Sequence, residues 1–237
     1  MRVTFLAHSG FLIELDNVLL LFDWWKGELP PLSAKPLLVF ASHAHPDHFG
    51  PHIFSLDDGR RTVRFLLGKD IRPTPKRCDR WGLTDTTLAK CQRLGGFHQA
   101  EPLPGVTVET FPSTDQGVAF LVSAEGRQIY HAGDLNWWHW EGEPDPWNPH
   151  MEVRYKEYTA PLKGRHLDLA MVPLDSRLGP AEDWGLRHLL EISDISHVLP
   201  MHQWGDFSPT GRFLKNHPQW AETILPVRAD GQVFQLD

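Results

Sequence analysis

Three imidazoles and one carboxylate are concentrated in the six residues His43-Ala44-His45-Pro46-Asp47-His48. They directly follow residues 37–41, an apolar run that is typical of a buried strand. Buried polar side chains are costly unless hydrogen bonds or a cation satisfy them, and imidazole and carboxylate are ordinary ligands of zinc and related metals. The spacing therefore indicates a metal site, which could activate water for hydrolysis at neutral pH. A solvated polar loop is the alternative.

Two later motifs, Gly133-Asp134 and Pro200-Met201-His202, support this interpretation. Together with the first motif, and in this order, they resemble the signature of the metallo-β-lactamase superfamily over essentially the whole chain. The resemblance implies an α+β fold, specifically a four-layer αββα sandwich. It also implies two metal ions, with the ligands divided as follows: the first ion is held by His43 and His45, the second by Asp47, His48 and His202, and Asp134 bridges both.

The chain departs from the family at the third ligand of the first metal, which is usually a histidine in a loop between two strands. The corresponding loop, residues 111–117, contains no histidine. Asp115 is the natural substitute because it offers an anionic oxygen and lies between two predicted strands; the alternative is a turn residue that caps Gly117. The resemblance implies two divalent ions, and we expect zinc first. Because an oxygen donor lowers the preference for zinc, manganese and iron are the alternatives. A single ion is expected if Asp115 is not a ligand.

Other side chains are candidates for a role beside the metals. His8 follows the first predicted strand in a loop that resembles one in related sugar-phosphate lactonases, and it is either a substrate contact or a plain hairpin residue. Asp175 is a substrate contact, a carboxylate that orients a ligand, or a helix cap. Asp47 is predicted to orient or deprotonate the nucleophile, and His139 to protonate the leaving group. His131 is predicted to orient a ligand.

Four of the ten tryptophans follow Asp134 closely, at positions 137, 138, 140 and 147. Prolines at 144, 146 and 149 interrupt the same segment. This composition, over about residues 135–165, is typical of an insertion or lid in which Trp137 and Trp138 contact the substrate and exclude water. A local hydrophobic core beneath a long loop explains the same residues.

Length and composition predict a single domain over residues 1–237, since 41% hydrophobic and 22% charged residues are ordinary for a globular protein. The formal charge of −7 and the lack of basic clusters disfavour nucleic acid and favour a small-molecule substrate. The N-terminal stretch lacks the pattern of a signal peptide, so we expect a cytoplasmic protein without membrane association. The two cysteines, Cys78 and Cys91, have neither disulfide nor metal-ligand spacing. Nothing indicates the oligomeric state.

The elements that must position these residues are mostly short strands. The β-rich runs predict strands over residues 3–7, 11–15, 18–22, 37–41, 62–67, 106–111, 118–122, 128–131, 168–172, 197–201 and 232–236. Helices are predicted over residues 51–56, 183–192 and 210–217. Residues 69–100 show no clear pattern. Most candidate site residues fall in loops directly after strands, where function commonly resides.

Together these features predict a metal-dependent hydrolase. It would direct a metal-bound hydroxide at an ester, lactone, amide or phosphodiester bond of a small molecule. A diiron oxidoreductase is one alternative, because some relatives of the family carry iron with carboxylate ligands. A metal-binding partner protein without catalytic activity is another, because a fold alone does not ensure activity.

Overall fold

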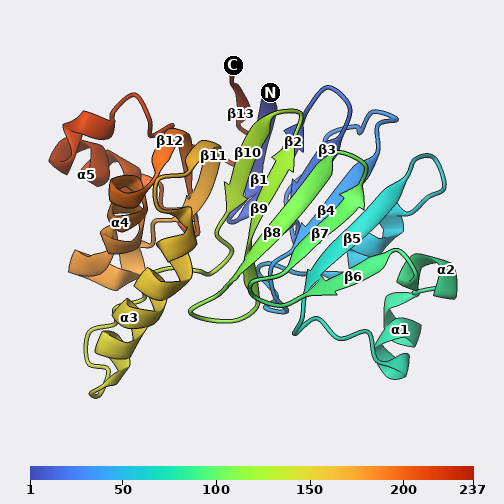
Figure 1. Cartoon of the computed structure of the whole chain (residues 1–237), viewed down its shortest axis with the longest axis horizontal. Helices are drawn as coiled ribbons and strands as arrows, with labels where there is room; N and C mark the ends of the chain where they lie inside the picture. The colour runs from blue at the N-terminus through green and yellow to red at the C-terminus, as the bar shows by residue number, and fades with distance from the viewer. The chain divides into compact units, whose positions relative to one another are not determined.

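The computed structural model describes all residues from 1 to 237, and they divide into two compact units. The N-terminal unit comprises residues 1–95 and 230–237, and the C-terminal unit comprises residues 96–229. Each unit contains one mixed β-sheet with its own helices (Figure 1). The predicted α+β class is therefore confirmed. The prediction of one domain stays a prediction.

The sheet of the N-terminal unit has seven strands in the order β13-β1-β2-β3-β4-β5-β6. Their bounds are β1 Arg2–Ala7, β2 Gly10–Glu14, β3 Leu19–Phe22, β4 Leu37–Ala41, β5 Val63–Gly68, β6 Cys91–Leu94 and β13 Val233–Gln235. Strands β1 to β3 form an antiparallel meander, and β3 to β6 are parallel. The helices are a 3₁₀ turn at Pro51–Leu56, α1 at Pro75–Trp81 and α2 at Asp85–Leu88.

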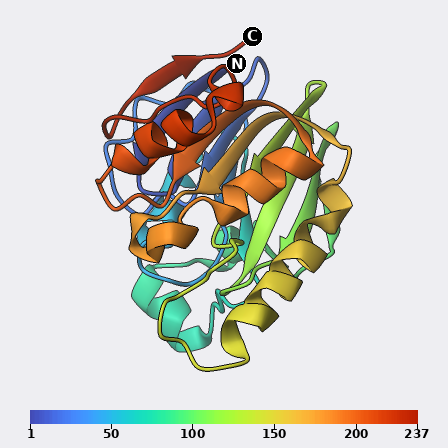
Figure 2. The same ribbon diagram turned by 90° about the vertical axis from the view of Figure 1, so that its left-hand side faces the viewer.

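The sheet of the C-terminal unit has six strands in the order β12-β11-β10-β9-β8-β7. Their bounds are β7 Gln99–Leu103, β8 Val106–Pro112, β9 Val118–Ala124, β10 Arg127–His131, β11 His166–Pro173 and β12 Asp194–Met201. The helices are α3 Trp147–Thr159, α4 Trp184–Ile192 and α5 Ser208–Asn216, with 3₁₀ turns at Ala160–Leu162, Ser176–Ala181 and Pro218–Trp220. Figure 2 shows α3 and α4 in front of this sheet, where α3 packs on β8 and α4 on β11.

Each strand predicted from the sequence is confirmed to within a few residues, because buried strands read as apolar runs. Strands β3 and β4, for example, are buried at every position. The unassigned stretch 69–100 contains α1, α2, β6 and the start of β7. The segment predicted as a tryptophan-rich insertion or lid contains α3, in which Pro149 is the third residue and needs no backbone N–H partner.

The direction of the strands explains where the candidate residues of the N-terminal unit lie. Strands β1, β3, β4 and β5 run in one direction, so their carboxyl ends share one edge of the sheet. The residues that follow these ends are His8, Asp23, the segment 42–48, and Asp70. Four loops distant in sequence therefore deliver their polar side chains to the same edge.

The C-terminal unit repeats this arrangement. Strands β8, β10, β11 and β12 run in one direction. Their carboxyl ends lead to Asp115, Asp134, Asp175 and His202 in turn. In each unit, strands that run in the same direction therefore place the candidate metal-binding side chains at one edge of the sheet.

No helix of the structure combines the length and the apolar character needed to cross a bilayer.

Close packing at the end of β5 provides a test of this strand arrangement. A Cβ atom on Gly68 would lie 2.1 Å from the carbonyl oxygen of Ser42, directly before the histidine motif. Because a backbone oxygen cannot move aside cheaply, we expect Gly68→Ala to lower the free energy of unfolding by about 1–3 kcal/mol in urea titrations. Gly211 in α5 is the control. A Cβ atom added there would meet no atom within 4 Å beyond the backbone of its own helix, so Gly211→Ala should keep or raise stability. Equal stability of both variants would contradict the packing.

Candidate metal centre

The three imidazoles of the motif lie in contact. The rings of His43 and His48 have centroids 4.2 Å apart, and His43 Nε2 lies 3.0 Å from His45 Nδ1. His43 and His48 are fully buried, whereas His45 is half-buried. Two ring nitrogens this close either share one proton or bind one cation. The structure thus brings these three predicted ligands together within the N-terminal unit.

Asp23, which the sequence analysis missed, orients this cluster from the end of β3. The buried carboxylate accepts hydrogen bonds from Ser42 N–H (2.7 Å), from Ser42 Oγ (2.6 Å) and from His48 Nδ1 (2.8 Å). Since His48 donates through Nδ1, its Nε2 carries the lone pair that a metal requires. A single aspartate directly after a predicted apolar strand was the available signal.

Ser42 fixes the tautomer of His43 in the same way. Its hydroxyl proton is donated to Asp23, and His43 Nδ1 lies 2.9 Å from the same Oγ. His43 must therefore donate from Nδ1, which leaves Nε2 as a lone-pair donor. Asp70, also missed from the sequence, accepts the Ala44 N–H at 2.7 Å and holds the loop in place.

In the C-terminal unit, His202 faces Asp134. The distance from His202 Nε2 to Asp134 Oδ1 is 3.4 Å, and a carboxylate oxygen of Asp115 lies within 4.8 Å of one on Asp134. His202 Nδ1 donates to Asp175 at 2.9 Å, so its Nε2 also presents a lone pair. Two lone-pair atoms that face each other repel unless a proton or a cation lies between them. The donor set fits a metal ion.

Asp175 matches the interpretation of a carboxylate that orients a ligand. It is fully buried, it receives the hydrogen bond from His202, and its other bonds come from Arg177. Burial alone would raise the pKa of Asp175, but the hydrogen bonds from His202 and Arg177 outweigh burial and lower the pKa to about 2. The carboxylate is therefore ionised at neutral pH. It also caps the 3₁₀ turn Ser176–Ala181, so two of the predicted roles coexist.

The metal-ligand and turn roles of Asp115 both stay predictions. Its side chain is exposed, and its backbone N–H donates to Ser113 Oγ at 3.1 Å, as in a turn. The neighbouring Thr114 exchanges hydrogen bonds with the backbone of Asn136, which ties this loop to the one that carries Asp134. His131 Nδ1 accepts the Gly133 N–H at 3.1 Å and so shapes the turn before Asp134.

The tryptophan segment divides between the site and a local core. The indole of Trp138 donates to the carbonyl of Asp134, and its ring lies edge-on to His202 at 5.5 Å. Trp137 instead packs against Tyr155 and Trp184. The structure supports a site wall for Trp138 and core packing for Trp137.

His139, the predicted proton donor, packs its ring on Trp184 at 4.7 Å and is half-buried. Trp184 belongs to the tryptophan cluster, which also contains Trp138, Met151 and Leu178. A catalytic role for His139 stays a prediction without a supporting contact.

Most of the strained backbone conformations lie directly after these same strands. Four of the six non-glycine residues with positive φ are His8, Asp23, His202 and Trp204. Such conformations cost on the order of 1–3 kcal/mol each and persist where surrounding structure enforces them. Their position beside the donors supports a functional role for both edges.

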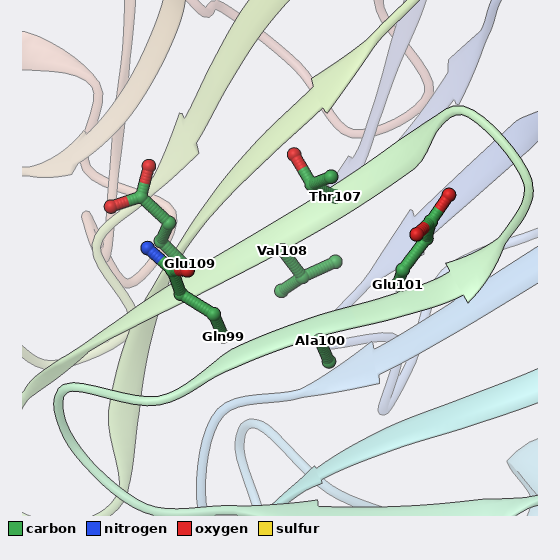
Figure 3. A pocket seen from close by; sticks show the side chains of 6 residues that line it. All are labelled: Gln99, Ala100, Glu101, Thr107, Val108 and Glu109. Atoms are coloured by element: carbon green, nitrogen blue, oxygen red, sulfur yellow. The ribbon is translucent and has the colours of Figure 1, made fainter.

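A separate hollow of roughly 350 Å³ lies on the β7–β8 hairpin (Figure 3). It is lined by Gln99, Ala100, Glu101, Thr107, Val108 and Glu109. None of these residues is a predicted ligand, and Glu109 is paired with Arg165 at 2.8 Å. The hollow is not a candidate for the metal centre.

Comparison with known proteins agrees with this geometry. Residues 2–139 match the model of the beta-lactamase superfamily domain. A metal-dependent hydrolase of Opitutus terrae is 30% identical over 225 residues, which cover 85% of this chain and 84% of the relative. These matches confirm the family resemblance that the sequence motifs indicate.

Two solved structures show the same fold. A metallo-hydrolase from the archaeon Ignicoccus hospitalis has a TM-score of 0.64 at 19% identity, with 100% of this chain and 99% of that chain covered. A diiron β-hydroxylase from Streptomyces venezuelae has a TM-score of 0.64 at 12% identity, with 99% of this chain and 54% of that chain covered. The predicted metallo-β-lactamase-like fold is confirmed.

The role of Asp23 can be tested by removing its charge. Asp23→Asn keeps the size of the side chain but weakens the acceptor of three hydrogen bonds, so His48 loses its fixed tautomer. We expect zinc affinity, measured by competition with a chromophoric chelator, to fall by about 10–100-fold. The exposed Asp16→Asn is the matched control and should leave affinity unchanged. Unchanged affinity in Asp23→Asn would refute the orienting role.

Proposed function

Because the chain belongs to the metallo-β-lactamase superfamily and is a metal-dependent hydrolase, we propose that it cleaves an ester, lactone, amide or phosphodiester bond of a small molecule. The observation that carries this proposal is that three imidazoles each donate a hydrogen bond from Nδ1, His43 to Ser42, His48 to Asp23 and His202 to Asp175, which places the lone pair of each ring on Nε2. Such orientation of ligands by carboxylates and hydroxyls is the usual support of a metal site.

We propose further that the chain holds two divalent ions, zinc first, through the seven ligands predicted from the sequence: His43, His45, Asp47, His48, Asp115, Asp134 and His202. The mixture of nitrogen and oxygen donors supports zinc, manganese or iron. When bound, the metals would acidify a water molecule and polarise the bond under attack.

The residues of the chain supply the rest of the chemistry. Asp47 is half-buried, and its Oδ2 lies 3.4 Å from His8 Nε2 and 3.9 Å from His48 Nε2. A carboxylate at that position can orient a nucleophile or accept its proton. In the C-terminal unit, Trp138 covers His202 and limits access of water to it.

A small and partly apolar substrate is supported by aromatic surface beside His202. The side chain of Trp204 is 52% exposed, and its ring lies edge-on to His202 at 5.7 Å. The guanidinium of Arg177 stacks on Trp204 at 4.8 Å and on Trp140 at 5.6 Å. Aromatic faces with one adjacent cation suit a planar organic group, so Trp204 is a better candidate substrate contact than the predicted Trp137.

A diiron oxidoreductase remains the second candidate, because Asp115 would add an oxygen donor and one solved structure of the same fold is a diiron β-hydroxylase. The cytoplasmic location and the preference for a small molecule over nucleic acid stay predictions.

Metal removal tests the proposed activity. Dialysis against a chelator should abolish hydrolysis of every substrate that the protein turns over in a panel of esters, lactones, amides and phosphodiesters. Zinc or manganese should restore turnover, because water activation depends on the cation. Turnover that is unchanged after complete metal removal would contradict the proposal. If iron alone restored turnover, and turnover consumed oxygen, the result would favour the oxidoreductase.

Asp115 can be tested by counting metals. If it is a ligand, Asp115→Ala should lower the metal content from about two ions per chain towards one, as measured by elemental analysis. The neighbouring exposed Gln116→Ala offers no carboxylate in either form and should keep the full content. An unchanged count in Asp115→Ala would assign Asp115 to the turn.

A further inference from the structure

We propose that His8 is an additional metal ligand that acts with Asp47 and His48. This inference rests on the proposed function and extends it, since the sequence predicts His8 only as a substrate contact or a hairpin residue. All three residues belong to the N-terminal unit, where β1 and β4 end at the same edge of the sheet.

The distances among the three side chains suit shared coordination. His8 Nε2 and Asp47 Oδ2 are 3.4 Å apart, His48 Nε2 and Asp47 Oδ2 are 3.9 Å apart, and the ligand atoms of all three lie within 4.8 Å of one another. Hydrogen bonds between nitrogen and oxygen are typically about 2.7–3.2 Å long. Ligands about 2.1 Å from a tetrahedral ion lie roughly 3.4 Å from each other. The spacing therefore matches coordination more closely than a hydrogen bond.

The orientation of the rings is consistent with coordination. His48 donates through Nδ1 to Asp23, so Nε2 is its metal-binding atom, and this is the atom near Asp47. The ring of His8 lies edge-on to that of His48, with centroids 5.6 Å apart. Two imidazoles and one carboxylate form a donor set used by zinc hydrolases and by non-haem iron proteins.

The position of His8 is also costly without a function. Its side chain is only 3% exposed, and its backbone has a φ of +56°. Asparagine or glycine adopts a positive φ at lower cost than histidine, and neither would bury an imidazole ring. Trp25 packs edge-on against the ring at 6.3 Å and limits its freedom to turn away from Asp47. Burial, strain and packing together hold one imidazole nitrogen beside the carboxylate.

The first test removes the imidazole of His8 and keeps the positive-φ backbone conformation at this position. His8→Asn retains a residue that tolerates positive φ. With zinc as the probe, in competition with a chromophoric chelator, we expect affinity at one site to fall by about tenfold or more. The visible absorption of the cobalt-substituted protein should change as well, because it reports the ligands of the ion. His52→Ala removes an exposed imidazole of the same unit and should change neither measurement.

The second test asks for direct coordination at the same position. In His8→Cys, a thiolate that binds cobalt should produce a near-ultraviolet sulfur-to-cobalt charge-transfer band that the wild-type protein lacks. Far-ultraviolet circular dichroism verifies that each variant is folded. This band would support the inference even if His8→Asn were unstable.

Two results would overturn the inference. If folded His8→Asn keeps wild-type zinc affinity and cobalt spectrum, and His8→Cys shows no charge-transfer band, then His8 only contacts Asp47. In that case the proposed hydrolase keeps its seven predicted ligands. If the wild-type protein binds neither zinc nor cobalt, the proposed function itself fails and His8 has no metal to bind.

Discussion

Parallel strand pairing is the constraint on which the site depends. Because the carboxyl ends of parallel strands meet at one edge, the loops after β3, β4 and β5 bring together side chains that are far apart in sequence. The C-terminal unit uses β10, β11 and β12 in the same way. Apolar burial within the strands fixes their register, and that register in turn fixes where each donor emerges.

The same polar arrangement occurs at both edges. Asp23 orients His48 and Asp175 orients His202, and each carboxylate accepts a buried hydrogen bond from the Nδ1 of its histidine, at 2.8 Å and 2.9 Å. A carboxylate that accepts a hydrogen bond from Nδ1 of an imidazole fixes the tautomer and makes Nε2 a stronger metal ligand. The carboxylates would be costly to bury alone, which explains why Ser42 and Arg177 supply further hydrogen bonds to them.

The features that could be predicted from the sequence are local ones. The run 43–48 and the apolar strand before it are contiguous, so residue types and spacing predicted both. Asp23 and Asp70 were missed because their roles depend on which strands are neighbours, and that order is not visible in one sequence. Helix α3 was missed because the tryptophans and prolines of its segment were interpreted as an insertion or lid. Trp137 and Trp138 are adjacent yet pack in different places, which composition cannot distinguish.

The central claim is that these clustered donors are built to hold a cation. The most direct test is thermal unfolding of the metal-free protein with and without added zinc, since a ligand that binds only the folded state stabilises it by about 2.7 kcal/mol at a hundred times its dissociation constant. We predict a rise of several degrees in Tm that saturates with zinc and is lost in His48→Ala. A Tm that zinc does not change, in a folded wild-type protein, would contradict the account.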